Sequence, residues 1–323
     1  MTLLITGSAG HLGEALMRTL RDRGIAARGL DIVPTPYTDA VGSITDRAFV
    51  RAAMAGVTGV LHTATLHKPH VATHARQAFV DTNVTGTLNL LEEAAAAGVA
   101  GFVCTSTTSA FGRALVPPPG EPAAWITEAV RPVPKNIYGV TKVAAEDLCE
   151  LLHGLAKLPC VVLRTSRFFP EDDDDPSALE VRSAANLQAN EFLSRRVDIE
   201  DVVEAHLVAL REAPRIGFGR FIVSATTPFT PDDLAELRHD APAVLRRRVP
   251  GWEAVYAGHG WTMTERLDRV YVNALARERL GWQPRTDFAA VVARLAASGD
   301  IRSPMAKTIG IKGYHAGGLG SRA

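Results

Sequence analysis

The sequence predicts an α/β fold with a doubly wound parallel sheet, and three observations carry this prediction. Short apolar segments alternate with segments whose apolar residues recur at helical spacing along the first half of the 323-residue chain. The apolar segments are continuous instead of alternating in polarity, which is typical of strands buried on both faces. The pattern becomes irregular from about residue 167, which indicates a smaller second lobe.

The predicted elements of the first half follow in a regular order. An apolar strand ends in glycine at residue 7, and the following helix stops at Gly24. Each later strand is apolar and each later segment is amphipathic. Strands are predicted at 2–7, 26–33, 57–64, 100–106 and 159–166, and helices at 11–24, 44–56, 74–98 and 137–157.

The second half is less regular. A polar loop is predicted at 167–180, a strand end running into a helix at 195–210, a strand at 219–225, a capped helix at 230–237, a helix at 269–282 and a loosely held glycine-rich tail at 310–323. We therefore expect residues 167–323 to form a small substrate-binding lobe. This lobe is interleaved with the last strands of the sheet and is not an independent domain.

Composition excludes several classes of partner. The formal net charge is +0 and the basic residues are dispersed, which gives no electrostatic reason to expect nucleic acid or a membrane surface as partner. No apolar run reaches the roughly 20 residues of a membrane span. The N-terminus does not resemble a signal peptide. The three cysteines, Cys104, Cys149 and Cys160, have no CxxC spacing, so we expect free thiols and a cytoplasmic location.

A dinucleotide site is predicted at the first strand–helix turn. In "ITGSAGHLG", Gly7, Gly10 and Gly13 let the backbone approach a pyrophosphate, and the helix N-terminus supplies N–H groups. Asp31 ends the second strand 18 residues after Gly13. A carboxylate there binds ribose hydroxyls and repels a 2′-phosphate, which favours NAD over NADP. Residues 1–166 are thus expected to form an NAD-binding, Rossmann-type domain; a merely tight turn is the alternative.

A second pair of residues lies on one helix face. Tyr138 and Lys142 are four residues apart in "YGVTK". Tyrosine titrates near 10 in water, and a neighbouring ammonium group would lower that pKa and make the phenol a better base. An ordinary exposed pair on an amphipathic helix is the alternative interpretation.

The motifs together resemble the extended short-chain dehydrogenases/reductases, in particular the NAD-dependent epimerase/dehydratase family. The resemblance covers nearly the whole chain and rests on "TGSAGHLG", "TNVTGTLNLLEEA", "TSTTSAFG", "YGVTK" and "VDIEDVVEAH". It implies that Thr107, five residues before Gly112, binds the reacting oxygen while Tyr138 moves a proton. Lys142 would tune Tyr138 and hold the nicotinamide ribose. The resemblance also implies a homodimer through a four-helix bundle of 74–97 and 137–156.

The same resemblance implies a wider set of cofactor contacts. Beside the glycines, Asp31, Tyr138 and Lys142, these are His11, Leu12, Ser43, Ile44, Thr63, Ala64, Thr65, Asn83, Thr105 and Ser166. Ser43 stands where the family usually has an acid, so contact there is expected from its hydroxyl or the backbone.

Departures from the family pattern constrain the reaction. Thr108 and Ser109 follow Thr107 where sugar-nucleotide dehydratases carry Asp-Glu, so dehydration is not expected. Only about 25 residues separate Pro170 from "RRVDIED", a stretch that is longer in sugar-nucleotide enzymes, which favours a smaller substrate. Arg167 stands where sugar-nucleotide epimerases have Asn; it faces an anionic substrate oxygen or pairs with Glu171–Asp175.

The remaining candidate substrate contacts are basic or polar. They are His67, Lys68, Thr107, Thr108, Arg167, Arg196 and Arg266, with Arg195 as a further diphosphate anchor. His67, His70 and His74 lie close together in sequence, but no carboxylate or cysteine completes a metal site, so no metal is expected. The acidic run 172–175 lacks the spacing of a calcium loop.

These observations leave two enzymatic interpretations open. The first is a sugar or nucleotide-sugar epimerase that regenerates NAD in each cycle. The second is a net NAD-dependent dehydrogenase of a small sugar, sugar acid or hydroxy acid. A non-catalytic NAD sensor is disfavoured because Thr107, Tyr138 and Lys142 are all present. The chemistry common to the first two is hydride transfer at a carbinol or ketone carbon.

Overall fold

The central sheet has seven strands, and every neighbouring pair is parallel. The structure is a computed structural model that describes residues 2–171 and 180–312. Most of the predicted loop 167–180 and the tail beyond residue 312 therefore lie outside the described residues. The strand order is β3-β2-β1-β4-β5-β7-β8. The strands are β1 (Thr2–Thr6), β2 (Ala27–Asp31), β3 (Ala40–Val41), β4 (Val57–His62), β5 (Phe102–Thr107), β7 (Cys160–Thr165) and β8 (Phe218–Val223).

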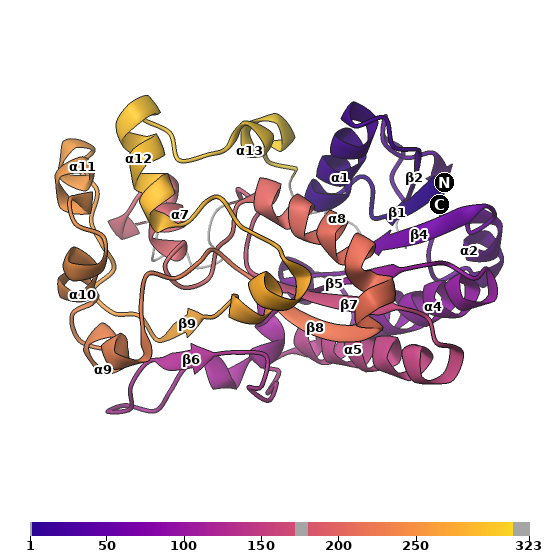
Figure 1. Cartoon of the computed structure of the whole chain (residues 1–323), viewed down its shortest axis with the longest axis horizontal. Coiled ribbons are helices and arrows are strands. Elements are labelled where there is room, and N and C mark those ends of the chain that lie inside the picture. Colours follow the sequence, from indigo (N-terminus) through magenta and orange to yellow (C-terminus); the bar gives the residue numbers. More distant parts are fainter. Residues whose placement is uncertain (1, 172–179, 313–323) are drawn as a thin grey trace.

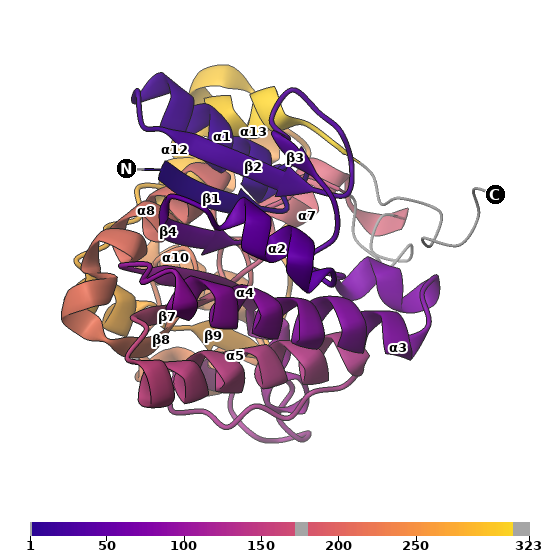
Figure 2. The same ribbon diagram turned by 90° about the vertical axis from the view of Figure 1, so that its right-hand side faces the viewer.

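Helices cover both faces of this sheet (Figures 1 and 2). On one face lie α1 (His11–Asp22) and α8 (Ile199–Ile216); on the other lie α2 (Arg47–Ala53), α4 (Gly86–Ala96) and α5 (Ile137–Ala156). Successive strand residues supply the two cores in turn. Leu3 and Ile5 pack with α1 and α8, whereas Leu4 packs with α2 and α4. This burial on both faces explains the continuous apolar strands, and the predicted doubly wound fold is confirmed.

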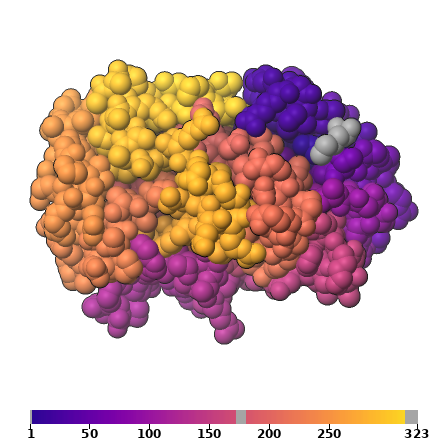
Figure 3. All heavy atoms as spheres, viewed as in Figure 1, coloured from indigo at the N-terminus to yellow at the C-terminus, as the bar shows by residue number. Residues whose placement is uncertain are grey.

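The second lobe has a core of its own. A two-stranded parallel sheet joins β6 (Ala124–Ile126) to β9 (Arg269–Tyr271). Around it lie α7 (Ala184–Glu191), α9 (Leu234–Leu237), α10 (Ala241–Arg248), α11 (Trp252–Gly258) and α12 (Phe288–Ser298). Figure 3 shows this C-terminal part gathered on one side of the molecule and the N-terminal residues on the other. The strand β8, which comes from the second half of the chain, forms the edge of the first sheet, and α8 packs on that sheet. The second lobe is therefore interleaved with the sheet in sequence. The division at residue 166 stays a proposal.

The predicted helix over 269–282 is wrong in its first part. Residues 269–271 form β9, and a π-helical turn follows only at Ala276–Leu280. Val270 and Tyr271 favour a strand, and both are buried against β6 and its neighbours. The apolar residues of 273–282 recur at helical spacing, and this pattern extended the helix prediction over the strand.

The long helix predicted at 74–98 is interrupted. It consists of α3 (Arg76–Phe79), a π-helical segment at Val80–Thr85 and then α4. The wider turn carries Asn83, whose buried amide reaches out of the helix to the backbone of Leu66. Among the described helices, none is long and apolar enough to cross a membrane.

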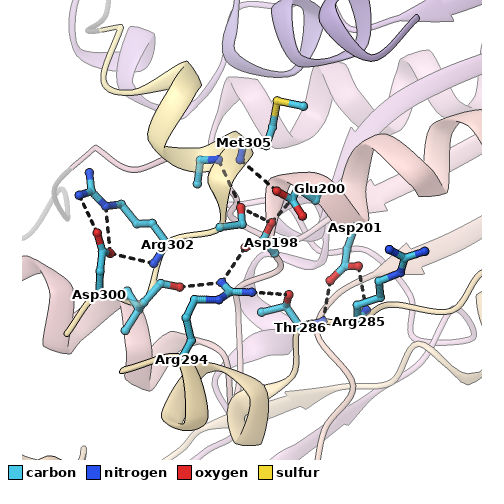
Figure 4. Close-up of polar contacts among 12 residues, drawn as sticks. Asp198, Glu200, Asp201, Arg285, Thr286, Arg294, Asp300, Arg302 and Met305 are labelled. Atoms are coloured by element: carbon cyan, nitrogen blue, oxygen red, sulfur yellow. Dashed lines mark hydrogen bonds and ion pairs between the residues drawn. The ribbon is translucent and has the colours of Figure 1, made fainter. Parts of the chain in front are cut away.

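The last helix of the described residues packs against α1 and α8. Residues before and within α13 (Pro304–Ile309) bind the first turn of α8, where Ser303 donates to Asp198 and the Met305 N–H donates to Glu200 (Figure 4). The buried carboxylate of Asp201 accepts the backbone N–H groups of Arg285 and Thr286. The N-terminus of α8, which packs on the sheet, is thus bound to two later segments of the chain, residues 285–286 and 303–305.

Candidate functional site

A cavity of about 960 Å³ lies at the carboxyl ends of the parallel strands. Its walls come from the residues that follow β1, β2, β4, β5 and β7, and from the second lobe at its far end. Open α/β sheets bind their ligands at this edge, where the strand order reverses on either side of β1 and β4.

The glycine turn forms one end of the cavity. Gly7 has a φ of +74°, which favours glycine. A Cβ at Gly13 would lie 1.9 Å from the carbonyl oxygen of Gly7, so only glycine lets α1 start this close to β1. Both residues, together with Gly10, line the cavity. The N-terminus of α1 therefore presents N–H groups and a positive dipole to a bound phosphate.

Asp31 lies at the end of β2 and also lines the cavity. Its two carboxylate oxygens accept the N–H groups of Ala9 and Val33, each at 3.0 Å. These bonds tie the acid to the glycine turn on one side and to the following loop on the other. Among the described lining residues Asp31 is the single carboxylate.

Most of the other predicted cofactor residues line the same cavity. They are His11, Leu12, Ser43, Ile44, Thr63, Ala64, Thr65, Thr105 and Ser166. Asn83 does not line it, and its predicted contact with the cofactor stays a prediction. Its side chain binds both backbone groups of Leu66 and the hydroxyl groups of Thr65 and Thr141. Asn83 therefore holds the loop after β4 in place from behind.

The predicted catalytic set is gathered where β5 meets α5. Thr107 ends β5, and its Oγ1 accepts the N–H of Ser109. Tyr138 begins α5, which Asn136 caps by accepting the N–H of Gly139. Thr107 and Tyr138 both line the cavity. Burial raises the pKa of Tyr138 to about 12, while a hydrogen bond with Thr107 acts in the opposite direction.

Lys142 lies one turn further along α5 and is buried behind the wall. Its ammonium group donates to the carbonyl oxygen of Thr105 at 2.6 Å. The group that opposes the rise of the Tyr138 pKa in this structure is therefore Thr107, where the sequence pointed to Lys142.

A buried ion pair supports this set, and the sequence analysis missed it. Glu146 accepts hydrogen bonds from Arg164 on β7, at 2.7 Å, and from Ser106 on β5, at 2.5 Å. Glu146 lies four residues after Lys142 on the same face of α5, which is the signal that would have found it. The pair joins α5 to both strands that carry the site.

Four of the predicted substrate residues besides Thr107 line the cavity: His67, Lys68, Thr108 and Arg167. Arg196 and Arg266 do not line it in this structure, and their predicted substrate contacts stay predictions. Arg196 is buried, and its Nε donates to Glu191 at 2.7 Å. Arg266 lies exposed on the second lobe, away from the cavity wall.

Arg167 makes contacts that bear on both of its predicted roles, which are binding an anionic substrate oxygen and pairing with the acidic residues. It lines the cavity, and its guanidinium contacts the side chain of Glu191 at 3.5 Å and the carbonyl oxygen of Glu171 at 3.0 Å. Residues 172–175 of the predicted acidic pairing lie outside the described residues. The rings of His67, His70 and His74 pack edge to face, and all three line the cavity. Within residues 2–171 and 180–312, no group of three or more potential ligands could hold a metal ion.

The structure adds lining residues that no local pattern had indicated. From the second lobe and the C-terminal segment these are Arg269, Tyr271 and Lys312, and from the loop before α5 they include Lys135. Arg269 and Tyr271 were assigned to a helix, so their positions on one face of β9 could not be expected.

Comparison with known proteins places this geometry in context. The model of the NAD dependent epimerase/dehydratase family matches residues 3–222. A UDP-glucose 4-epimerase of Streptomyces lividans is 26% identical over 333 aligned residues, covering 89% of this chain and 93% of that protein. A 3 beta-hydroxysteroid dehydrogenase/Delta 5-->4-isomerase of Mycobacterium tuberculosis is 27% identical over 327, covering 87% and 86%.

A solved structure gives the same picture at the level of the fold. A short-chain dehydrogenase/reductase superfamily protein from Agrobacterium tumefaciens with bound NAD superimposes with a TM-score of 0.64 at 24% identity. The match covers 92% of this chain and 96% of that one.

Proposed function

The chain belongs to the NAD dependent epimerase/dehydratase family, as its motifs implied, and on this premise we propose that it oxidises a carbinol carbon of a sugar-derived substrate to a ketone, or reduces the ketone, through Thr107, Tyr138 and Lys142. It is an NAD-dependent enzyme of the epimerase and dehydrogenase type. NAD supplies the hydride acceptor and donor. The residues of this chain bind the substrate and move its proton.

One observation carries the proposal. The phenol of Tyr138 and the hydroxyl of Thr107 both line the wall of the cavity whose other end is the glycine turn, and Thr107 is close enough to oppose the rise in the pKa of Tyr138. A substrate hydroxyl that binds both groups has an acceptor for its proton and a donor for its oxygen. Lys142 adds a positive charge one helical turn from the phenol, although in this structure Thr107 is the group that opposes the rise in the pKa of Tyr138.

Dehydration is not part of the proposal. Thr108 and Ser109 occupy the two positions after Thr107, and neither side chain can donate or accept a proton near neutral pH in place of a carboxyl group. The UDP-glucose 4-epimerase and the steroid dehydrogenase among the relatives share the chemistry that remains, which is oxidation of a secondary alcohol to a ketone.

The short segment between Pro170 and Arg195 favours net dehydrogenation of a small sugar, sugar acid or hydroxy acid as the second candidate. That segment holds only about 25 residues, of which the described part includes α7, so it offers little chain with which to enclose a nucleotide. A nucleotide-sugar epimerase remains the first candidate because the relative of Streptomyces lividans aligns over nearly its whole length.

One experiment separates these candidates. Purified protein is incubated with NAD and with free sugars, sugar acids, hydroxy acids or UDP- and GDP-sugars, and both NADH fluorescence and isomerised product are measured. NADH that accumulates with a small substrate supports the dehydrogenase, and isomerised nucleotide sugar without net NADH supports the epimerase. If the Tyr138→Phe variant is as active as the unmodified protein, the proposal is wrong.

We also propose a homodimer formed through α4 and α5, which lie side by side along one side of the molecule (Figure 2). The outer face of α5 carries Val140, Leu151 and Leu155, all exposed, and at 74% exposure Leu155 is the most exposed large apolar residue in the described part of the chain. Light scattering after size exclusion should give a dimer mass. Leu151→Glu with Leu155→Glu should give a monomer, whereas exposed Val181→Glu should not.

A cytoplasmic location completes the proposal. Cys104, Cys149 and Cys160 are all free and buried, which suits a reducing compartment. Fractionation of expressing cells should place the protein with other cytoplasmic enzymes.

A further inference from the structure

The charges that line the cavity are strongly unequal. Asp31 supplies the single carboxylate among the described lining residues, and it lies at the glycine turn. Six basic side chains line the same cavity: Lys68, Lys135, Arg167, Arg195, Arg269 and Lys312. A cavity lined in this way attracts anions and disfavours cations. The pyrophosphate of NAD accounts for positive charge at the glycine turn, but not for Arg269 in the second lobe.

Arg269 lies at the end of the cavity that carries the proposed reaction centre. It is on β9, two residues before Tyr271, so both side chains are on one face of that strand. Its guanidinium lies 5.9 Å from the centre of the Tyr271 ring, and this ring lies 6.5 Å from that of Phe111. Phe111 belongs to the short turn that follows Thr107. A continuous line of contacts thus leads from Thr107 to Arg269.

Arg269 differs from the other arginines near it. Arg167, Arg195 and Arg196 all form ion pairs with the carboxylate of Glu191. The carboxylate of Asp268, the residue beside Arg269, forms an ion pair with Arg238. In the described part of the chain the side chain of Arg269 has no hydrogen bond or ion pair, and its Nε is buried. A buried donor of a charged group without an acceptor is costly, and a ligand oxygen would remove that cost.

We propose that Arg269 binds an oxyanion group carried by the substrate, a carboxylate or a phosphate ester, and that the enzyme therefore acts on an acid and not on a neutral sugar or sterol. The guanidinium fork suits this role because it binds two oxygens of one group in a fixed plane. The ring of Tyr271 packs against one side of the guanidinium group and helps to orient it. The inference rests on the proposed function for its reaction centre, but Arg269 can be tested without any turnover.

The experiment uses matched ligands that differ only in the group at C6: a hexose, the corresponding uronic acid and the corresponding hexose 6-phosphate. Binding is measured by calorimetry with NAD present, in Tyr138→Phe protein so that no reaction intervenes, and kinetics are measured in otherwise unmodified protein. Arg269→Gln should weaken binding of the anionic ligand at least about 30-fold, because a buried charge partner is lost. Arg269→Lys should recover part of that loss. The uronic acid and the phosphate show which oxyanion is preferred.

The control is Arg266→Gln, since Arg266 lies three residues earlier, is exposed and does not line the cavity. This variant should bind like its parent. The inference is overturned if the hexose binds as tightly as its anionic partners, or if Arg269→Gln binds them unchanged. Anion binding through Arg269 without turnover of any ligand would overturn the proposed reaction alone. Turnover of neutral sugars that Arg269→Gln leaves unchanged would support the reaction and overturn this inference.

Discussion

The ammonium group of Lys142 lies 2.6 Å from the carbonyl oxygen of Thr105, two residues before Thr107 on β5. A lysine of α5 is thus bound directly to the strand that presents Thr107. The hydroxyl of Thr105 in turn binds the ring of His206 on α8, at 2.8 Å. The position of the Lys142 ammonium group is therefore set by a residue of β5 that is itself bound to α8.

Lys142→Met should lower kcat by at least about 100-fold, since the phenolate of Tyr138 loses its nearest proposed cation. Lys142→Arg keeps the charge and should retain more of the activity than Lys142→Met. The measurement is kcat as a function of pH, with a melting curve for each variant. Equal activity of the methionine and arginine variants would show that the charge is not what Lys142 contributes.

Tyr138→Phe should lower turnover by about 1,000-fold or more while changing NAD affinity little, because the phenol moves a proton and the dinucleotide is held elsewhere. Burial raises the pKa of Tyr138 to about 12, so the reactive phenolate is scarce near neutral pH in the protein without ligands. The rate of alcohol oxidation should therefore rise with pH between 7 and 10 in the unmodified protein. A pH-independent rate over this range would contradict the role of base.

Asp31→Asn should weaken NAD binding by about 10-fold. The ratio of the affinity for NAD to the affinity for NADP should also fall, since a neutral side chain no longer repels a 2′-phosphate. Asp31→Ala should do more damage, because it also removes the acceptor of the Ala9 and Val33 N–H groups. Fluorescence titration of both cofactors against each variant provides the measurement. A preference of the unmodified protein for NADP would show that Asp31 has been misinterpreted.

Glu171→Gln should speed the release of NAD by about 5- to 10-fold. The ring of His11, at the start of α1, lies 2.6 Å from the carboxylate of Glu171, and the N–H of Lys312 binds the same oxygen. Burial raises the pKa of Glu171, but the hydrogen bond and charge of His11 outweigh it and leave the pKa below its usual range. We expect this contact beside the glycine turn to slow the release of a bound dinucleotide. Stopped-flow displacement of NADH measures this rate, and the comparison is Glu14→Gln, which disturbs the side-chain bonds of Lys312 and Arg18 but leaves Glu171 in place.

The parts of the site that the sequence could predict are those built from local segments. The glycine turn, Asp31 and the Tyr138–Lys142 spacing each belong to one strand end or one helix face, and the structure gathers most of them around one cavity. Arg269 could not be predicted, because its position depends on the pairing of β9 with β6, far away in the chain. Glu146 was missed for a similar reason: its partners Arg164 and Ser106 lie on two different strands.

The buried carboxyl groups at the start of α8 should make stability depend on pH (Figure 4). Burial raises the pKa of Asp201 to about 6, although the N–H groups of Arg285 and Thr286 act in the opposite direction. Burial also raises the pKa of Asp198. For a carboxyl group this direction means that the folded state favours the protonated form, so ionisation destabilises the fold. The contribution of Asp201 to the free energy of unfolding should therefore fall as pH rises from about 4 to about 6.

The shift of Asp201 from its ordinary value of 3.8 corresponds to about 3 kcal/mol. The free energy of unfolding of the Asp201→Asn variant is subtracted from that of the unmodified protein. The contributions of the titrating groups that both proteins share then cancel. Asparagine loses one of the two backbone bonds, and this cost does not depend on pH. Urea unfolding between pH 4 and 7.5 should therefore show the largest disadvantage of the variant at pH 4, shrinking by up to about 3 kcal/mol by pH 7. A difference that stays constant across this range would mean that Asp201 ionises as readily in the folded protein as in the unfolded chain.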